Sequence, residues 1–199
     1  AMIRGRELDE DKYLFFVTRN GTVKRMSQAA LRNIRANGLR ALNLDEGDEL
    51  ISVFDTTGDE DILIATNKGM AVCFNENDVR PMGRTAVGVR GIRLREGDYV
   101  VGAGSTSAGN ALLTITEKGY GKPTLCSEYA VKGRGGIGLK NYNVTEKTGN
   151  IAAVKIVTGD EDVLVITDDA TIIRIGVDRI SLLGRATQGV RIMRLAEGS

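Results

Sequence analysis

Gly138-Leu-Lys-Asn-Tyr-Asn-Val144 is one of four related heptapeptides whose spacing indicates the architecture of this 199-residue chain. The other three are Gly38-Leu-Arg-Ala-Leu-Asn-Leu44, Gly88-Val-Arg-Gly-Ile-Arg-Leu94 and Gly189-Val-Arg-Ile-Met-Arg-Leu195. Their first glycines are spaced by 50, 50 and 51 residues. A nearly constant period of this length indicates that the chain repeats one supersecondary unit and does not build a single irregular core.

An apolar run that closes in a turn precedes each heptapeptide. The four runs are Tyr13-Leu-Phe-Phe-Val-Thr-Arg-Asn-Gly21, Ile62-Leu-Ile-Ala-Thr-Asn-Lys-Gly69, Leu112-Leu-Thr-Ile-Thr-Glu-Lys-Gly119 and Val163-Leu-Val-Ile-Thr-Asp-Asp-Ala170. Short runs rich in Ile, Val, Leu and Thr are typical of strands, and a dipeptide such as Asn-Gly supplies the positive φ of a tight hairpin turn. Two strands are therefore predicted around each turn.

The first unit shows the expected order of strands. Tyr13–Thr18 is predicted to pair with Thr22–Met26, and further strands are expected over Gly38–Leu44 and near Glu49–Phe54. Four strands in about fifty residues make one four-stranded antiparallel blade. Radial repetition of such blades limits the exposed sheet edges of an all-β protein.

The predicted fold is therefore all-β and propeller-like, with about four blades in one repeat domain over residues 11–199. Residues 1–10, which begin with an Ala before the first Met, are interpreted as a tag or linker remnant. One short helical turn is predicted within residues 27–36, where an Ala-Ala-Leu segment carries no turn chemistry. The blades are expected at approximately 12–60, 61–110, 111–161 and 162–199, the last of them incomplete.

Composition narrows the classes of function. With 42% hydrophobic and 27% charged residues, the chain is typical of a soluble globular protein. It shows neither an apolar stretch of the roughly 18 to 20 residues that a membrane helix needs nor a signal peptide, so a cytoplasmic protein without a membrane partner is expected. The lack of histidine argues against Ser-His nucleophiles and most zinc catalysis. The chain is predicted not to be an enzyme by itself and to need no cofactor or metal.

The positions of the charges carry more information than the net charge of +1. Five basic residues and no acid lie between Lys24 and Arg40, and five arginines and no acid lie between Arg80 and Arg95. Acidic residues collect in the linkers between units, for example over residues 45–49 and 160–162. Because every unit repeats this segregation, stacked blades are expected to align the basic segments into one continuous stripe.

The candidate binding residues are cations that recur at repeated offsets. Four lie two residues after the heptapeptide glycine, three lie in the segment before it, and four lie in the hairpins. In that order they are Arg40, Arg90, Lys140 and Arg191; Arg84, Arg134 and Arg185; and Lys24, Arg25, Lys122 and Arg174.

Cations spaced by one blade around a curved rim suit the phosphates of duplex DNA, whose contacts with Lys and Arg are cumulative and independent of sequence. The neighbouring glycines are expected to let a phosphate approach the backbone amides closely. With five Tyr, four Phe and no Trp, the chain offers few stacking platforms for single strands. Duplex DNA is therefore the predicted partner.

Three segments resemble the repeats of a known family, the C-terminal domain of the bacterial DNA gyrase A protein. They are Phe15-Phe-Val-Thr-Arg-Asn-Gly-Thr-Val-Lys-Arg25, Asp78-Val-Arg-Pro-Met-Gly-Arg-Thr-Ala-Val-Gly-Val-Arg-Gly-Ile-Arg-Leu-Arg-Glu-Gly-Asp98 and Leu183-Gly-Arg-Ala-Thr-Gln-Gly-Val-Arg-Ile-Met-Arg-Leu195. The resemblance recurs in all four units from about Asp11 to Gly198, and the sister domain of topoisomerase IV resembles the chain less.

The resemblance implies a β-pinwheel, a propeller-like disc whose neighbouring blades exchange strands and around whose basic rim DNA wraps. It also implies a role in the introduction of negative supercoils by an ATP-dependent type II DNA topoisomerase. In that enzyme the partners are the gyrase A catalytic region and the gyrase B protein, and this domain does not cut DNA. A cytoplasmic, nucleoid-associated location in bacteria follows from the same resemblance.

The chain departs from the family pattern in two ways. The family domain usually has six blades, the first of which carries an Arg-Gly-Gly-rich box required for supercoiling, and that blade is expected to be missing. Gly133-Arg-Gly-Gly-Ile-Gly138 resembles a degenerate copy of the box, but it lies in the third unit. An open or truncated arc is therefore expected, which binds and bends DNA without completing a wrap.

The alternative function is a propeller that serves as a protein-interaction platform for an acidic partner. Such a platform would concentrate its cations on one face or in one groove, whereas DNA wrapping requires equivalent cations from successive blades along the outer edge. The repeated offsets of the candidate cations favour DNA.

Overall fold

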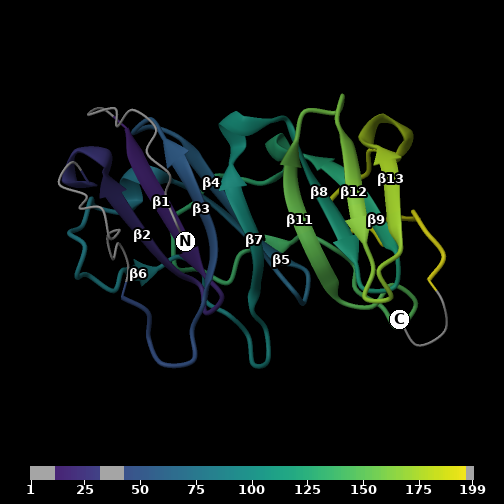
Figure 1. Ribbon diagram of the computed structural model, residues 1–199, viewed down its shortest axis with the longest axis horizontal. Coiled ribbons are helices and arrows are strands. Elements are labelled where there is room, and N and C mark those ends of the chain that lie inside the picture. The colour runs from purple at the N-terminus through teal and green to yellow at the C-terminus, as the bar shows by residue number, and fades with distance from the viewer. Residues whose placement is uncertain (1–11, 32–42, 196–199) are drawn as a thin grey trace.

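The computed structural model describes residues 12–31 and 43–195 and shows antiparallel sheets that stand side by side along the longest axis (Figure 1). The first sheet has the order β3-β1-β2-β6, the second β10-β5-β4-β7 and the third β11-β8-β9-β14. β12 and β13 form a two-stranded fourth sheet. The predicted all-β pinwheel with about four blades is confirmed, with three four-stranded blades and a fourth that has two described strands.

Each blade is built on a hairpin whose strands follow the predicted apolar runs. The hairpins are β1 (Tyr13–Thr18) with β2 (Thr22–Ser27), β4 (Asp61–Thr66) with β5 (Met70–Asn75), β8 (Ala111–Thr116) with β9 (Tyr120–Leu125), and β12 (Asp162–Ile166) with β13 (Ile172–Gly176). A third strand from the same unit pairs with the first hairpin strand in three blades. These strands are β3 (Leu50–Thr56), β7 (Val100–Ser105) and β11 (Ile151–Val157).

The fourth strand of each complete blade comes from the following unit. β6 (Val89–Arg90) pairs with β2, β10 (Leu139–Lys140) with β5, and β14 (Val190–Arg191) with β9. The prediction that all four strands of a blade come from one stretch of fifty residues is therefore wrong, because the heptapeptide strand pairs with the hairpin of the preceding unit. The exchange of strands that the family resemblance implied is present. The predicted strand over Gly38–Leu44 lies mostly outside the described residues.

The two edges of each complete sheet have different surroundings. β3 contacts β7, and β7 contacts β11, so these three strands lie next to one another along the inner edge of the arc. β6, β10 and β14 occupy the opposite edge of their sheets and are called the outer edge strands below. A ligand that reaches all three complete blades from outside would meet the outer edge strands.

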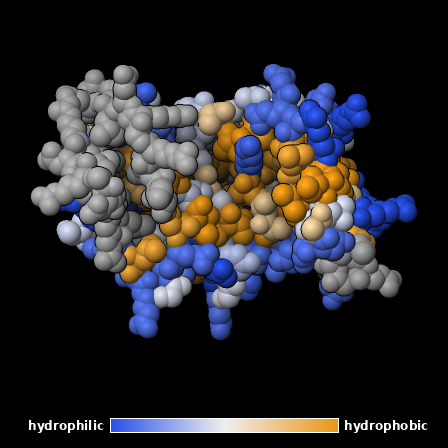
Figure 2. Space-filling model, viewed as in Figure 1, coloured by the Kyte–Doolittle hydropathy of each residue, from blue (hydrophilic) through white to orange (hydrophobic). Residues whose placement is uncertain are grey.

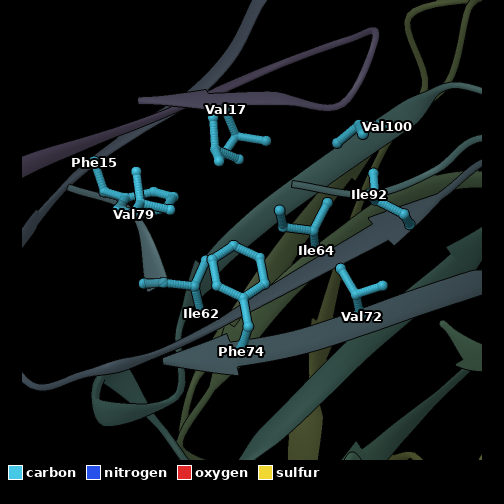
Figure 3. Packing of buried hydrophobic residues seen from close by; sticks show 10 residues of the cluster. Phe15, Val17, Ile62, Ile64, Val72, Phe74, Val79, Ile92 and Val100 are labelled. Carbon is cyan, nitrogen blue, oxygen red and sulfur yellow. The ribbon is translucent and has the colours of Figure 1, made fainter. Parts of the chain in front are cut away.

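The hydrophobic core lies between the blades, because the hairpins of the three complete blades are covered on both faces. From β4, Ile62 and Ile64 pack toward Phe15 of the first blade (Figure 3). The alternate residues Leu63 and Ala65 belong to a second cluster on the other face, which includes residues of the third blade. Burial of both faces explains why this strand reads as a continuous apolar run and does not alternate.

Short 3-10 turns follow all four hairpins. They are η1 (Gln28–Leu31), η2 (Glu76–Asp78), η4 (Cys126–Glu128) and η5 (Val177–Arg179), and a further turn, η3 (Thr106–Ala108), follows β7. The single helical turn predicted within residues 27–36 is present as η1, whereas the other four turns were not predicted. Their segments contain the polar turn residues that also occur in loops, so composition alone does not separate the two.

The fourth blade leaves hydrophobic side chains exposed. Leu164, Ile166 and Ile172 are 65%, 67% and 64% exposed, and Figure 2 shows hydrophobic residues gathered over the side of the molecule where β11 to β13 lie. Among the described residues, no helix is long and apolar enough to span a bilayer.

Candidate nucleic-acid interface

The outer edge strands carry one exposed cation at the same register position in each complete blade. Arg90 pairs with Thr22, Lys140 with Met70, and Arg191 with Tyr120, each partner being the first residue of the second hairpin strand. All three cations are exposed. Three successive sheets therefore present a positive charge at equivalent places along one edge.

The glycine two residues before each of these cations is required by close packing between units. A Cβ atom on Gly138 would lie 2.2 Å from the carbonyl oxygen of Ala71, and one on Gly88 would lie 2.4 Å from that of Val23. Both glycines also have positive φ, of 88° and 111°. We expected these glycines to let a phosphate approach the backbone. The structure gives them a role in packing instead, since the backbone of the preceding blade fills the space beside them.

The segments before the glycines fold over the second hairpin strand of the preceding blade. The backbone N–H of Met82 donates to Arg25, that of Lys132 to Cys73, and that of Leu183 to Pro123. These three segments, residues 80–88, 130–138 and 181–189, are called the crossing loops below. Each crossing loop leads directly into an outer edge strand.

The crossing loops carry the three predicted arginines Arg84, Arg134 and Arg185. Arg84 and Arg134 are exposed, and Arg185 is half-buried. Arg134 donates from Nη1 to the carbonyl oxygen of Arg90 at 3.1 Å, and Arg185 donates from Nη1 to the carbonyl oxygen of Lys140 at 2.9 Å. These last two guanidinium groups therefore lie against the outer edge strand of the preceding unit.

Lys24 and Lys122, in contrast, are not surface cations, which corrects the expectation that they line the rim. Both side chains have no exposed area. The Nζ atom of Lys24 donates to the carbonyl oxygens of Arg84 at 3.0 Å and Ala86 at 2.9 Å. Burial lowers the pKa of Lys24. Burial also lowers the pKa of Lys122 to about 8. The negative charge of Glu128 acts to raise this pKa, and the positive charge of Arg185 lowers it further.

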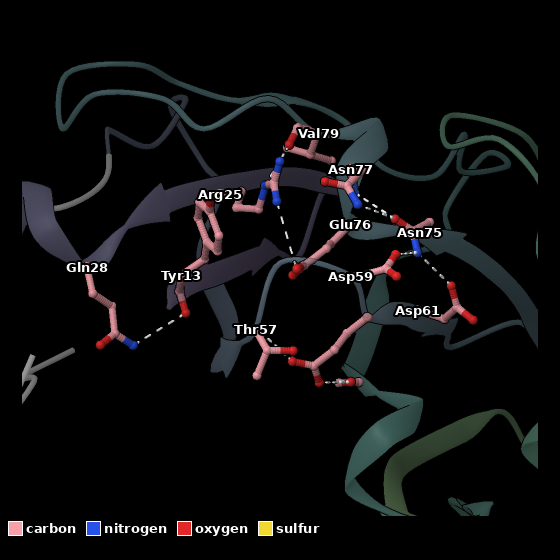
Figure 4. Close-up of polar contacts among 12 residues, drawn as sticks. Tyr13, Arg25, Gln28, Thr57, Asp59, Asp61, Asn75, Glu76, Asn77 and Val79 are labelled. Carbon is pink, nitrogen blue, oxygen red and sulfur yellow. Dashed lines mark hydrogen bonds and ion pairs between the residues drawn. The ribbon is translucent and has the colours of Figure 1, made fainter. Parts of the chain in front are cut away.

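Arg25 is also buried and does not face a ligand from the rim. Its Nε atom donates to the carbonyl oxygen of Val79 at 2.7 Å, and its Nη1 atom lies 3.8 Å from Oε1 of the fully buried Glu76 (Figure 4). The guanidinium also lies over the ring of Tyr13. Since β2 is covered on both faces, neither Lys24 nor Arg25 reaches solvent, although successive strand residues point in opposite directions.

Two further predicted cations differ from the outer edge set. Arg174 in β13 is exposed, but it forms an ion pair of 2.5 Å with Asp162 of the neighbouring strand, which offsets its charge locally. Arg40 lies outside the described residues. The structure therefore brings together six of the predicted cations, namely Arg84, Arg90, Arg134, Lys140, Arg185 and Arg191, on the crossing loops and outer edge strands.

Additional exposed cations lie beside this set. Arg93 follows β6 and Lys132 precedes Arg134, and both are exposed. Lys132 was missed because the equivalent positions in neighbouring units are Met82 and Leu183. The position of Arg93 recurs as Arg194 in the fourth unit, so a search for cations at repeated offsets could have found it.

The acidic linkers act as turn caps. Asp48 accepts from the backbone N–H of Asn20 at 3.0 Å, and Asp98 accepts in the same way from Lys68 at 2.9 Å. These acids therefore stabilise the tips of hairpins, whereas the outer edge strands carry the cations. Within residues 12–31 and 43–195, no cluster of three or more Asp, Glu or Cys side chains is arranged to hold a metal ion.

Known proteins resemble this chain in both sequence and fold. The profile of the family described as "DNA gyrase C-terminal domain, beta-propeller" matches residues 12–57, 60–107, 110–158 and 161–199. The DNA gyrase A protein of Staphylococcus epidermidis is 48% identical over 201 residues, which cover 100% of this chain and 22% of that protein. The DNA gyrase A protein of Clostridium acetobutylicum is 51% identical over 194 residues, which cover 98% of this chain and 23% of that protein.

Two solved structures have the same arrangement of blades. A DNA gyrase A C-terminal domain superposes with a TM-score of 0.86 at 27% identity, covering 97% of this chain and 65% of that one. The C-terminal domain of a DNA topoisomerase IV superposes with a TM-score of 0.89 at 26% identity, covering 96% of this chain and 60% of that one. The chain thus spans less than a quarter of the length of the two gyrase proteins named above. With a profile match in all four repeats and a pinwheel that exchanges strands between blades, the chain belongs to the family of DNA gyrase C-terminal domains.

Proposed function

We propose that this chain binds duplex DNA without sequence specificity along its outer edge strands, and that it bends the DNA around the arc of blades. The observation that carries the proposal is the equivalent register of Arg90, Lys140 and Arg191 in three successive sheets. The crossing-loop arginines lie beside them and widen the positive surface.

The physical basis is the regular charge of the DNA backbone. Each phosphate contact from Lys or Arg releases counterions and adds to affinity whatever the base sequence. Several such contacts held at fixed spacing on a curved edge can offset the roughly 1 to 6 kcal/mol needed to bend a short duplex. Because Arg90, Lys140 and Arg191 are attached to hydrogen-bonded strands, their backbone would lose little conformational entropy on binding.

In the longer gyrase A protein, we propose that this binding wraps DNA and presents a second segment for strand passage, so that negative supercoils are introduced. ATP hydrolysis and DNA cleavage would then belong to the remainder of gyrase A and to gyrase B. A location with the bacterial nucleoid follows from the same proposal. This assignment rests on the family and on the outer edge cations.

The alternative of a platform for an acidic protein receives less support from the surface. A hollow between the third and fourth blades is lined mostly by apolar side chains, and the single lysine there, Lys155, is accompanied by Glu117 and Asp168. A second hollow beside β3 contains Lys12 together with Asp55 and Glu60. Neither hollow concentrates positive charge.

The test is binding to a duplex of about 40 base pairs over a series of salt concentrations, with fluorophores at both ends reporting their separation by energy transfer. We expect tight binding whose affinity falls steeply with salt, and an increase in energy transfer as the ends approach. A triple variant that replaces Arg90, Lys140 and Arg191 with Ala serves as the control. If the native chain does not bind duplex DNA at low salt, or if the triple variant binds equally well, the proposal is wrong.

A further inference from the structure

Two buried lysines hold the backbone of crossing loops that belong to the following unit. Lys24 and Lys122 stand at the same position of their hairpins, three residues after Gly21 and Gly119. Each lies about sixty residues before the loop that it contacts. These contacts therefore join one repeat to the next at the place where a candidate DNA-binding arginine is presented.

Lys122 has its hydrogen-bonding capacity filled by one loop. Its Nζ atom donates to the carbonyl oxygen of Gly184 at 2.6 Å, to that of Arg185, and to Oγ1 of Thr187 at 3.1 Å. Three acceptors match the three N–H donors of a lysine ammonium group. The side chain is fully buried, so these acceptors replace the water that the ammonium would otherwise bind.

Tyr142 supports the same loop from the third unit. Its ring lies under the Nζ atom of Lys122 at 4.9 Å from the ring centroid, and its hydroxyl donates to the carbonyl oxygen of Gln188. Lys122 and Tyr142 thus hold both ends of the segment from Gly184 to Gln188, and Arg185 lies between them.

Lys24 has the corresponding arrangement in the first blade. It donates to the carbonyl oxygens of Arg84 and Ala86, which lie in the crossing loop of the second unit. In both blades, one of the acceptors is the backbone of the candidate DNA-binding arginine itself. The lysine and the arginine are therefore connected through a single peptide group.

The crossing loop over the second blade is held in a different way. Val72 occupies the position of the lysine and packs in the hydrophobic core. The loop arginine there is held by its own side chain, since Nε of Arg134 donates to the carbonyl oxygen of Asp78 at 2.9 Å. The arginine of each crossing loop is thus hydrogen-bonded in all three blades, through its backbone carbonyl to a buried lysine in two of them and through its side chain in the other.

We propose that Lys24 and Lys122 are positioning residues for DNA binding, which fix the backbone of Arg84 and Arg185 without touching DNA. This inference rests on the proposed function. A buried ammonium is expensive to desolvate, and a hydrophobic side chain fills the same position in the second blade, so packing alone does not require a lysine there.

The inference is tested by two double-mutant cycles measured as duplex DNA affinity. Lys122→Met keeps most of the length of the side chain, being one atom shorter, and removes its donors. Arg185→Ala is expected to weaken binding by about five- to tenfold through the loss of one phosphate contact. Lys122→Met should weaken binding several-fold in the native background and have little further effect in the Arg185→Ala background, because coupled residues are not additive.

Lys24→Met is the matched control. It should couple to Arg84→Ala in the same way and be additive with Arg185→Ala. Because neither lysine contacts phosphate, each Lys→Met variant should flatten the salt dependence by less than the corresponding arginine variant. Full additivity between Lys122→Met and Arg185→Ala, or an unchanged affinity for Lys122→Met, would overturn the inference.

A milder variant protects the test against loss of folding. Tyr142→Phe removes only the hydrogen bond to Gln188 on the same loop, and circular dichroism checks that each variant is folded. Tyr142→Phe should also weaken DNA binding and couple to Arg185→Ala, whereas additivity would count against the inference. Failure of the native chain to bind duplex DNA would instead refute the proposed function, which keeps the two outcomes distinct.

Discussion

Arg134 in the third unit donates a hydrogen bond from Nη1 to the backbone carbonyl oxygen of Arg90 in the second unit, at 3.1 Å. Arg185 makes the same contact with Lys140 one unit further along, at 2.9 Å. The cation of one crossing loop is thereby attached to the cation of the preceding outer edge strand. The folded protein sets the spacing of these cations before binding, so a ligand with regular negative charge would meet a preorganised surface.

The combined substitution of Arg90 and Arg134 by Ala is expected to weaken DNA binding about equally for all base sequences. The slope of log affinity against log salt should flatten by about two units, since each lost phosphate contact accounts for about 0.9. Binding titrations over a salt series with two unrelated duplexes measure both quantities. Lys155→Ala, which removes an exposed cation from the inner edge strand β11, is the control and should leave the slope nearly unchanged. A changed base preference would indicate direct contact with bases instead.

Arg25→Met is expected to destabilise the fold and not to remove a DNA contact. The substitution leaves Glu76 buried with neither carboxylate oxygen in a hydrogen bond. Breaking a buried pair in this way costs about 3 to 5 kcal/mol. Urea unfolding should show this loss and its partial recovery when Glu76→Gln is added. The folded double variant should bind DNA with nearly native affinity. A flattened salt dependence would mean that Arg25 does contact DNA.

Lys122 is expected to make stability depend on pH in the alkaline range. Burial lowers its pKa from 10.5 to about 8 in the folded protein. Between these values the unfolded chain binds more protons, so the free energy of unfolding should rise with pH, by at most about 1.4 kcal/mol per pH unit. Urea unfolding at pH 7.5 and 9.5 measures the rise, and Lys122→Met should reduce it. Equal pH dependence in the two proteins would mean that Lys122 keeps its ordinary pKa.

Gly138→Ala is expected to destabilise the chain by at least about 2 kcal/mol, because a positive φ and a backbone clash act together. The new Cβ would lie 2.2 Å from the carbonyl oxygen of Ala71. Gly133→Ala is the matched control in the same crossing loop, since no atom lies within 4 Å of the added Cβ. Thermal unfolding should separate the two variants, and similar melting temperatures would contradict the packing described for Gly138.

Ala170→Gly is expected to stabilise the fourth blade. Ala170 has φ of 63° at the turn where the other three hairpins have Gly21, Gly69 and Gly119. A left-handed conformation costs a residue with a Cβ about 1 to 2 kcal/mol, part of which is offset by the greater flexibility of Gly in the unfolded chain. A net gain of about 0.5 to 1 kcal/mol should appear in urea unfolding. A loss of stability would mean that Ala170 makes compensating contacts.

The repeat, the hairpins and the shared offset of the outer edge cations can all be read from the sequence alone. The apolar runs and turn glycines have local causes, namely side-chain shape and positive φ, so they can be read without knowledge of distant residues. Arg90, Lys140 and Arg191 were predicted together because they stand at one offset in each unit. The family resemblance supplied the exchange of strands between blades.

Which cations face solvent depends on tertiary packing. Lys24 and Arg25 are adjacent in one strand, and a two-residue alternation places their side chains on opposite faces of the sheet. Both are nevertheless buried, because residues from about sixty positions later cover the strand and supply the acceptors for both side chains. Burial of a charge depends on which distant segment packs over it, and that partner is set by the docking of one repeat on the next.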